Sequence, residues 1–415
     1  MARRPLAAAL RAALAKPDRL PAALEPWADT ELTPADADGL CTVLAEQADV
    51  RPLLAPAGGP TTPLYHLAAL FQNDAADEAT RALRKRGMAE LARLFDAAMI
   101  LPDPPAEPLV FVCKMFALYA YRPGVRRIAA GVRRFPDEFQ WQIVFALLGD
   151  ERHPHGPGVV ARLRDPLPPG FGGVLLLDVA NVLAGRGRLD RHPFDTPAGC
   201  ARLEAWLADT DPENFSYASS AAAALPYLGA KARAPLASLA MDHSSPDVQL
   251  EAAAASARRG GTAGLKLLVR TCADPRHSLA AQGYLTELGR ADQIPAAAAE
   301  PDFRASAELC RWLAHPHEFG APPAEIELAD TRELDWPPTN DRRRVWLFRY
   351  AYADGIAAGL GMVGSLTFAL VGEATAGLSA EDAYGLHCCW ELEFNGDPRA
   401  PKKRNAKAGR KLLGI

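Results

Sequence analysis

A repeat of about 30 residues is the feature that most constrains how this chain can fold. Glycines that end apolar, helix-forming segments lie at Gly229, Gly260 and Gly289, which are 31 and 29 residues apart. Each interval has room for two helices and their turns, and one such hairpin is too small to bury its own apolar face. The spacing therefore predicts a stack of helical hairpins in which each hairpin covers the next.

The first helix of each unit has the same pattern of side chains. Three segments align, YASSAAAAL from Tyr217, VQLEAAAAS from Val248 and HSLAAQGYL from His277. A small residue recurs where two helices would approach most closely, at Ala221, Ala252 and Ala281. Alanine has the highest helix propensity and permits close helix packing, so the pattern favours tightly packed helices over a β-sandwich.

This pattern resembles the HEAT-like repeats first named for the phycobilisome lyases. Their consensus is roughly V-R-x-x-A-A-x-A-L-G after an aspartate-rich turn, and Asp247-Val248 with the alanines at 252, 253 and 255 match it. The arginine of the consensus is replaced in all three units. The resemblance covers residues 212–292 and implies a curved helical scaffold, an α-solenoid like those of bacterial HEAT-repeat proteins of unknown function. It does not imply lyase activity.

The first 200 residues have clear helix starts but no regular period. Thr33-Pro34, Thr62-Pro63 and Thr196-Pro197 each place a hydroxyl at the N-cap and a proline in the first turn. They predict helices that extend through Leu44, Phe71 and Leu207. The segments 108–121 and 138–149 are apolar on nearly every side, which predicts helices covered by neighbours on both sides. We expect irregular helical repeats here.

The chain changes character after residue 314. A proline- and acid-rich stretch, 315–341, is typical of a linker or an extended segment. After it, residues 345–352 alternate with aromatic side chains on one face, which predicts a strand, and 361–373 predicts a second one. Ser379 begins a helix with Asp382 at its third position.

These patterns predict a mainly α-helical protein with a small C-terminal α+β domain. The expected parts are irregular helical repeats over 1–200, HEAT-like repeats over 201–314, a linker over 315–341, an α+β domain over 342–395, and a solvated basic tail over 396–415.

Charge and cysteine content limit the classes of function. A formal charge of −4 gives no general attraction to nucleic acid or to anionic membranes, and no uncharged apolar run approaches the roughly 20 residues that span a bilayer. The seven cysteines form no C-x-x-C pair, which indicates reduced thiols in a reducing compartment.

Leu6, Leu10 and Leu14 have helical spacing, so we interpret the N-terminus as a first helix rather than a targeting segment. A cytoplasmic protein is expected.

An arginine stripe is the candidate binding site. Residues 124–134 read GVRRIAAGVRR, so two arginine pairs seven residues apart lie along one helical face, with one more arginine just before them: Arg122, Arg126, Arg127, Arg133 and Arg134. Such a face can bind phosphate or carboxylate groups, and HEAT-like DNA glycosylases use a concave basic face in this way. The alternative is a solvated helix face whose arginines pair with neighbouring acids.

Three other motifs suggest chemistry but have simpler interpretations. The string 359–364 matches G-x-G-x-x-G, yet a strand rather than a helix follows it, so we expect a flexible hairpin loop. His387, Cys388 and Cys389 point in different directions on a helix, which favours buried packing over a metal site. The His-Pro-His triplets at 153–155 and 315–317 would together form only an unusual four-histidine site. We therefore predict no metal or cofactor.

The leading functional hypothesis is a non-enzymatic scaffold or adaptor that binds a protein partner on its concave face. The alternative is a nucleic-acid-binding or DNA-processing protein that uses the arginine stripe. A weaker third hypothesis places an enzyme site between the helical array and the C-terminal domain.

Overall fold

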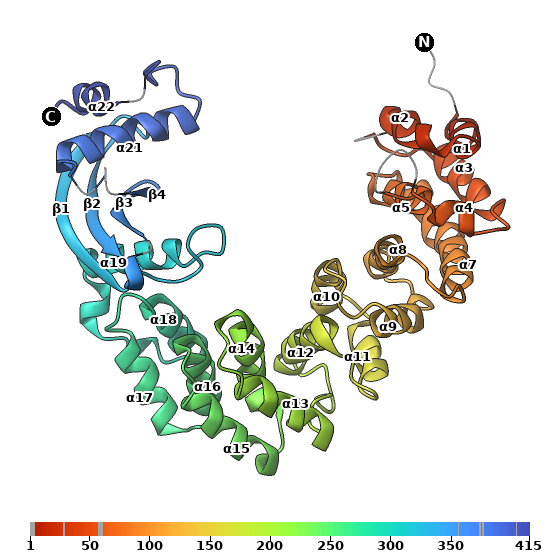
Figure 1. Ribbon diagram of the computed structural model, residues 1–415, viewed down its shortest axis with the longest axis horizontal. Coiled ribbons are helices and arrows are strands. Elements are labelled where there is room, and N and C mark those ends of the chain that lie inside the picture. Colours follow the sequence, from red (N-terminus) through yellow and green to blue (C-terminus); the bar gives the residue numbers. More distant parts are fainter. Residues whose placement is uncertain are drawn as a thin grey trace. The chain divides into compact units, whose positions relative to one another are not determined.

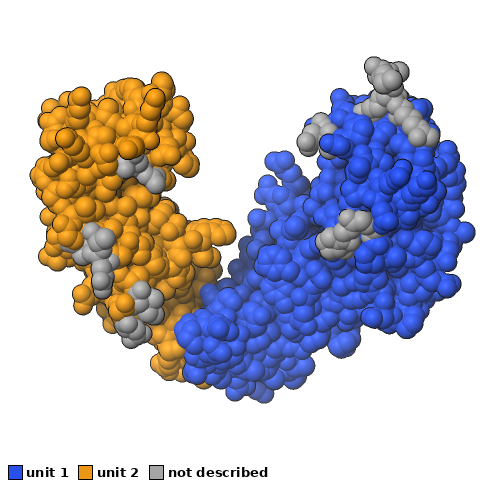
Figure 2. All heavy atoms as spheres, turned by 45° about the horizontal axis from the view of Figure 1, so that its top comes forward, with its two compact units in different colours: residues 1–236 blue, residues 237–415 orange. Residues whose placement is uncertain are grey.

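The computed structural model describes residues 5–27, 30–56, 61–355, 357–372, 375, 377–403 and 405–415 (Figure 1). The protein is mainly helical, with a small antiparallel sheet of four strands near the C-terminus. The chain divides into two compact units, residues 1–236 and residues 237–415 (Figure 2). Each unit is described by itself.

Unit 1 is built from helices joined by short turns. Its helices are α1 (Leu6–Leu14), α2 (Leu20–Leu24), α3 (Pro34–Ala45), α4 (Arg51–Leu54), α5 (Pro63–Ala69), α6 (Asp77–Ala82), α7 (Met88–Met99), α8 (Ala106–Leu118), α9 (Gly124–Arg134), α10 (Trp141–Gly149), α11 (Gly156–Leu163), α12 (Gly170–Gly185), α13 (Pro197–Leu207) and α14 (Phe215–Ala224). The boundary between the units falls within α15 (Ala230–Met241).

The predicted helix starts are confirmed. Thr33 and Asp36 form a reciprocal capping box at α3. The hydroxyl of Thr62 accepts a hydrogen bond from the Tyr65 backbone N–H at α5, and that of Thr196 accepts one from the Gly199 N–H at α13. Helix α1 begins at Leu6, and residues 1–4 of the predicted first helix lie outside the described residues.

The helices of unit 1 pack in two rows. Helices α5, α8, α10, α12 and α14 follow one another in the first row, each in contact with the next. Helices α7, α9 and α11 form the second row, and α8 packs on α9 and α11 on α12 to join the rows (Figure 1). Helix α8 is the best covered of them, because nine of its thirteen residues are buried.

Hydrogen bonds between neighbouring hairpins repeat at one sequence separation. The Asp137 carboxylate accepts from the Phe171 backbone N–H at 3.2 Å, and the Asp195 carboxylate accepts from the Gly229 N–H at 3.2 Å. Both bonds span 34 residues, and both reach the start of a helix in the next hairpin. A carboxylate there satisfies backbone donors that the helix itself leaves unpaired.

Unit 2 combines helices with the sheet. Its helices are α16 (Pro246–Arg258), α17 (Thr262–Thr271), α18 (Ser278–Glu287), α19 (Pro301–Leu313), α21 (Ala380–Phe394) and α22 (Ala406–Leu413). Its strands are β1 (Glu325–Trp336), β2 (Asp341–Ala351), β3 (Ala358–Val363) and β4 (Thr367–Val371). Ala252 and Ala281, predicted to lie at close helix contacts, are buried, as is Ala221 in unit 1.

The four strands form an antiparallel meander in the order β1-β2-β3-β4 with helices on both faces. Leu309 and Leu313 of α19 pack against Phe348 and Tyr350 on one face. The other face carries Trp336 and the remaining inward residues of β1 to β3, which pack against α21. Ser379 caps α21 by accepting from the Asp382 N–H, as predicted.

The expected linker at 315–341 is wrong for residues 325–336, because they form strand β1. The acids that suggested a solvated linker face arginines of the neighbouring strand: Glu333 lies opposite Arg344, and Asp335 lies opposite Arg342. Opposite charges at paired positions stabilise an antiparallel ladder. The C-terminal α+β structure therefore begins before residue 342.

The second predicted strand, 361–373, is two strands, and the G-x-G-x-x-G string is not a loop. It lies in β3 and the following turn. Its glycines are required by packing: a Cβ on Gly361 would lie 2.3 Å from a methyl group of Leu309, and one on Gly359 would clash with the Leu370 carbonyl. Residues 373 and 374 lie outside the described part of the chain.

The basic tail predicted at 396–415 contains a folded helix. Asn405 caps α22 by accepting from the Ala408 N–H, and α22 packs on α21. Gly385 and Gly409 meet at this crossing, where a Cβ on Gly409 would overlap the Gly385 carbonyl. Leu413 joins the core of the sheet. The prediction of a solvated tail is wrong here because the high charge of the segment conceals the apolar side of an amphipathic helix.

Candidate functional site

The predicted arginine stripe is divided by the structure into bound and free members. The guanidinium of Arg127 forms a two-pronged ion pair with Asp96 of α7, with Nε at 2.8 Å from Oδ1, and its Nη1 donates to the Pro123 carbonyl at 2.8 Å. Arg127 is only 8% exposed. It therefore joins α9 to α7 instead of facing solvent.

Arg133 and Arg134 bind carbonyl groups of neighbouring loops. Arg133 donates to the carbonyls of Arg162 and Asp165 at 2.5 and 3.2 Å, and Arg134 donates to those of Leu101 and Pro102 at 3.1 and 2.7 Å. These acceptors close the hairpins before and after α9. The two arginines thus satisfy backbone carbonyls in adjacent hairpins.

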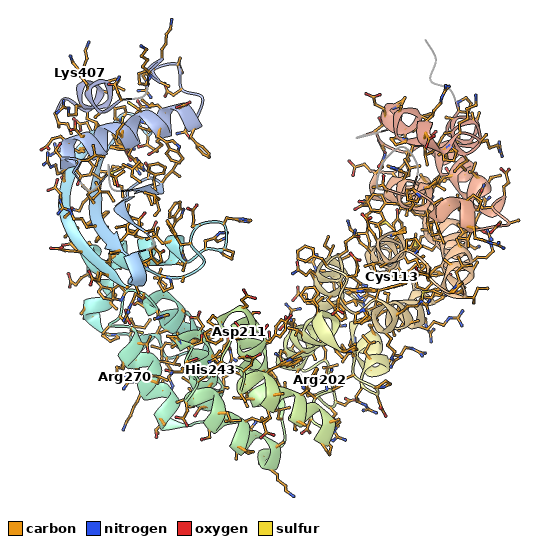
Figure 3. All side chains as sticks on the ribbon, in the orientation of Figure 1. Cys113, Arg202, Asp211, His243, Arg270 and Lys407 are labelled. Atoms are coloured by element: carbon orange, nitrogen blue, oxygen red, sulfur yellow. The ribbon has the colours of Figure 1, made fainter. Side chains whose placement is uncertain are left out.

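The same use of arginine recurs along unit 1. Arg202 of α13, which Figure 3 labels, donates to the Pro168 carbonyl at 2.5 Å. Arg188 binds the carbonyls of Asp150, Glu151 and His153. A basic stripe in this array is thus largely a means of joining successive hairpins.

A basic pocket of about 600 Å³ remains beside the stripe, between α7, α9 and α11. Its charged lining residues are Arg93, Asp96, Arg122, Arg126, Arg127 and Arg162. The predicted residues of this pocket are Arg122, Arg126 and Arg127. Arg93 and Arg162 were missed, although the sequence carries a signal for them, because Arg93, Arg127 and Arg162 are 34 and 35 residues apart.

A second candidate surface is apolar and lies on the first row of helices. Leu118 of α8, Ile143 of α10 and Val182 of α12 are 46%, 47% and 43% exposed. Phe139, just before α10, is 70% exposed, and its ring stacks parallel to that of Phe171. Exposed large apolar side chains on successive helices are typical of an interaction surface.

A groove of about 480 Å³ between α10 and α12 continues this surface. Phe145, Leu175 and Val179 form its apolar walls, and Asp178 lies among them. Loss of hydration raises the pKa of the Asp178 carboxyl, and a hydrogen bond with Ser220 of α14 opposes that shift. The groove therefore combines apolar walls with two carboxylates, Asp150 and Asp178, and with the guanidinium of Arg186, which donates to the Gly149 carbonyl.

The prediction that α8 and α10 are covered on both sides is wrong at Leu118 and Ile143. Composition showed that these helices are apolar on every side, but it could not show which side has no neighbour. In the structure, the rows cover all but one face of each helix. These exposed residues are the ones that sequence reasoning missed.

The remaining motifs have structural roles. Ring nitrogens of His153 and His155 hydrogen-bond the carbonyls of Ala117 and Ala120 at 2.9 and 3.1 Å. His387, Cys388 and Cys389 are buried, as predicted. All seven cysteines are free thiols, including Cys113 in the interior of α8 (Figure 3). Within the described ranges, no group of three or more His, Cys, Asp or Glu side chains could hold a metal ion.

Comparison with known proteins gives no family: no family model, curated protein or solved structure matches the chain. Among the residues that the structure describes, no helix has the length and apolar character required to cross a membrane. The two surfaces of unit 1 are therefore the candidate functional sites of the chain.

Proposed function

We propose that this protein is a non-enzymatic interaction scaffold, built as a HEAT-like α-solenoid, which binds a protein partner on the exposed face of α8, α10 and α12. The observation that carries the proposal is the set of exposed apolar side chains Leu118, Ile143 and Val182, one on each of three neighbouring helices of the first row. Stacked repeats place side chains of neighbouring helices on one extended surface.

The helix packing supports the solenoid. Each first-row helix contacts the next helix of its row, and hydrogen bonds link equivalent points of neighbouring hairpins 34 residues apart. That separation is close to the spacing of 31 and 29 residues between Gly229, Gly260 and Gly289. The same period in sequence and in contacts is expected of stacked hairpins.

The groove indicates what kind of segment the partner contributes. Its apolar walls favour aliphatic or aromatic side chains. The carboxylates of Asp150 and Asp178 outnumber the one guanidinium of Arg186, which favours a lysine or arginine beside them. We therefore propose a partner segment that is apolar with an adjacent positive charge. The free thiols support placing this interaction in a reducing compartment such as the cytoplasm.

The nucleic-acid alternative has less support. Arg127, Arg133 and Arg134 already bind acceptors of this chain, which leaves Arg122 and Arg126 of the predicted stripe. A backbone-tracking surface needs several free cations in a line. Duplex DNA is therefore a competing outcome in the tests below.

Site-specific photo-crosslinking in the native cell tests the proposal. A photoreactive phenylalanine analogue at Ile143 or Val182 is expected to capture the same discrete protein, whereas the analogue at Ile100 is not. Ile100 is the matched control because it is 84% exposed and lies just after α7, outside the first row of helices.

Charge placed on the apolar surface, at Ile143 of α10 and at Val182, which lines the groove, provides the second half of the test. Ile143→Asp together with Val182→Asp is expected to abolish capture by an analogue at Phe139, since an apolar partner cannot desolvate two carboxylates. Ile100→Asp is expected to leave capture unchanged. Equal capture at positions 143, 182 and 100, or crosslinks to nucleic acid alone, would contradict the scaffold proposal.

A further inference from the structure

The pocket between α7, α9 and α11 concentrates positive charge that the chain does not neutralise. Five arginines and a single carboxylate, Asp96, line it. Asp96 is already bound, because both of its oxygens accept from Arg127. No other acid lines the pocket to offset the remaining charge.

The arginines of the pocket differ in what they already bind. Arg93 donates to Glu90 at 2.8 Å and to the carbonyls of Gln47 and Leu44 at 3.0 and 2.8 Å. Arg93 and Arg127 are therefore fixed parts of the wall.

Three guanidinium groups remain available to a ligand. Arg126 reaches Asp96 only at 3.4 Å, and its side chain is 63% exposed. The side chains of Arg122 and Arg162 are exposed and make no hydrogen bond or ion pair with any residue that the structure describes. Three exposed cations around one hollow repel one another, and a bound anion would reduce that repulsion.

The start of α9 adds to the positive potential. The pocket is lined by Arg122 and Pro123, which precede α9, and by Val125 and Arg126 of its first turn. That turn contains no acidic residue. The N–H groups of Gly124 and Val125 already donate to the carbonyls of Tyr121 and Arg122, so the dipole of α9 is what favours an anion at the same place.

We propose that this pocket binds a phosphate monoester. A phosphate dianion offers three acceptor oxygens to the planar donors of Arg122, Arg126 and Arg162, and guanidinium groups bind phosphate through such paired donors. The apolar wall of Ala89, Ala92 and Val125 provides room for the group that carries the phosphate.

A single phosphate fits these observations better than a nucleic-acid backbone. The free guanidinium groups surround one hollow, whereas a phosphodiester track needs cations spaced along a surface. Arg133 and Arg134, which would extend such a track along α9, bind carbonyl groups instead. The site lies on the second row of helices, so it does not depend on a partner at α10 and α12.

Isothermal titration calorimetry of the full chain at low salt tests the site with four probes. These are inorganic phosphate, a phosphoserine peptide, a nucleoside monophosphate and duplex DNA. Inorganic phosphate is expected to bind, and whichever monoester binds more tightly identifies the carrier. The double variant Arg122→Gln/Arg162→Gln is expected to weaken binding about tenfold or more, the effect of losing a charge-assisted hydrogen bond.

Two further variants make the result specific. Arg126→Gln alone is expected to weaken binding as well. This substitution removes only one long contact, with Asp96, from the folded protein. Arg152→Gln is the control, because Arg152 is 90% exposed at its side chain and lies outside the pocket. Absence of monoester binding, equal binding by the double variant and the control, or DNA binding with which phosphate does not compete would overturn the proposal.

Discussion

At the scale of single residues, arginine in this protein connects structure more than it displays charge. Arg127 is 8% exposed and pairs with Asp96, so Arg127→Met removes the ion pair of a buried guanidinium and leaves a half-exposed carboxylate without it. We expect the free energy of unfolding to fall by roughly 1–3 kcal/mol. Arg126→Met, at an exposed position on the same helix, is expected to change it by less than about 0.5 kcal/mol. Urea denaturation measures both, and equal losses would contradict the assignment.

His387 predicts a pH dependence at the same scale. It is 1% exposed, neither ring nitrogen has a hydrogen-bond partner among the described residues, and Glu391 lies 3.8 Å away. Burial lowers the pKa of His387 from 6.5 to about 3. Between these values only the unfolded chain takes up the proton, so stability is complete above pH 6.5 and falls as the pH decreases towards 3.

The variant His387→Phe isolates this effect. It keeps an aromatic ring beside Trp336 and Phe368 but cannot be protonated. Its free energy of unfolding is expected to fall less steeply from pH 6.5 to 4, by up to about 1.4 kcal/mol per pH unit. Burial also lowers the pKa of His192, to about 4. His192 therefore reduces the free energy of unfolding at acidic pH in the parent protein and in the variant alike. Parallel pH profiles for the two proteins would show that His387 is not the source.

At the scale of elements, the crossing of α21 and α22 depends on two glycines. Gly409→Val places a side chain where the Gly385 carbonyl lies, so we expect α22 to detach and trypsin to cleave rapidly at Arg410 and Lys411. Valine has a higher helix propensity than glycine, so a loss of the helix could not come from propensity. Lys407→Val, on the exposed side of α22, is the control, and equally fast cleavage of that variant would contradict a steric cause (Figure 3).

The same scale shows what the sequence could predict. Helix starts at Thr33, Thr62 and Thr196 were correct because a cap depends on residues within one turn. Strand β1 was mistaken for a linker because its stability depends on arginines that follow in β2. The exposure of Ile143 was missed for a related reason. Periodicity gives the faces of a helix, but only the packing of other helices decides which face stays open.

At the scale of the whole molecule, a stack of repeats predicts local rather than global loss of structure. In such a stack each hairpin is stabilised by its neighbours, so damage spreads only to adjacent repeats. Leu176→Ala removes a fully buried side chain from α12 and is expected to cost about 2–5 kcal/mol. In hydrogen-exchange mass spectrometry, α10, α11, α12 and α14 should lose protection, while the helices and the sheet of unit 2 should keep theirs.

A reciprocal substitution completes this test of the repeat architecture. Leu268→Ala in α17 also removes a fully buried side chain, and its neighbours are α16 and α18. We expect protection to fall in those three helices and to persist in α10 and α12. If either substitution removes protection throughout both units, the chain folds around one cooperative core. In that case the shared period of 29–35 residues in sequence and contacts does not reflect independent repeats, and the scaffold proposal loses its structural basis.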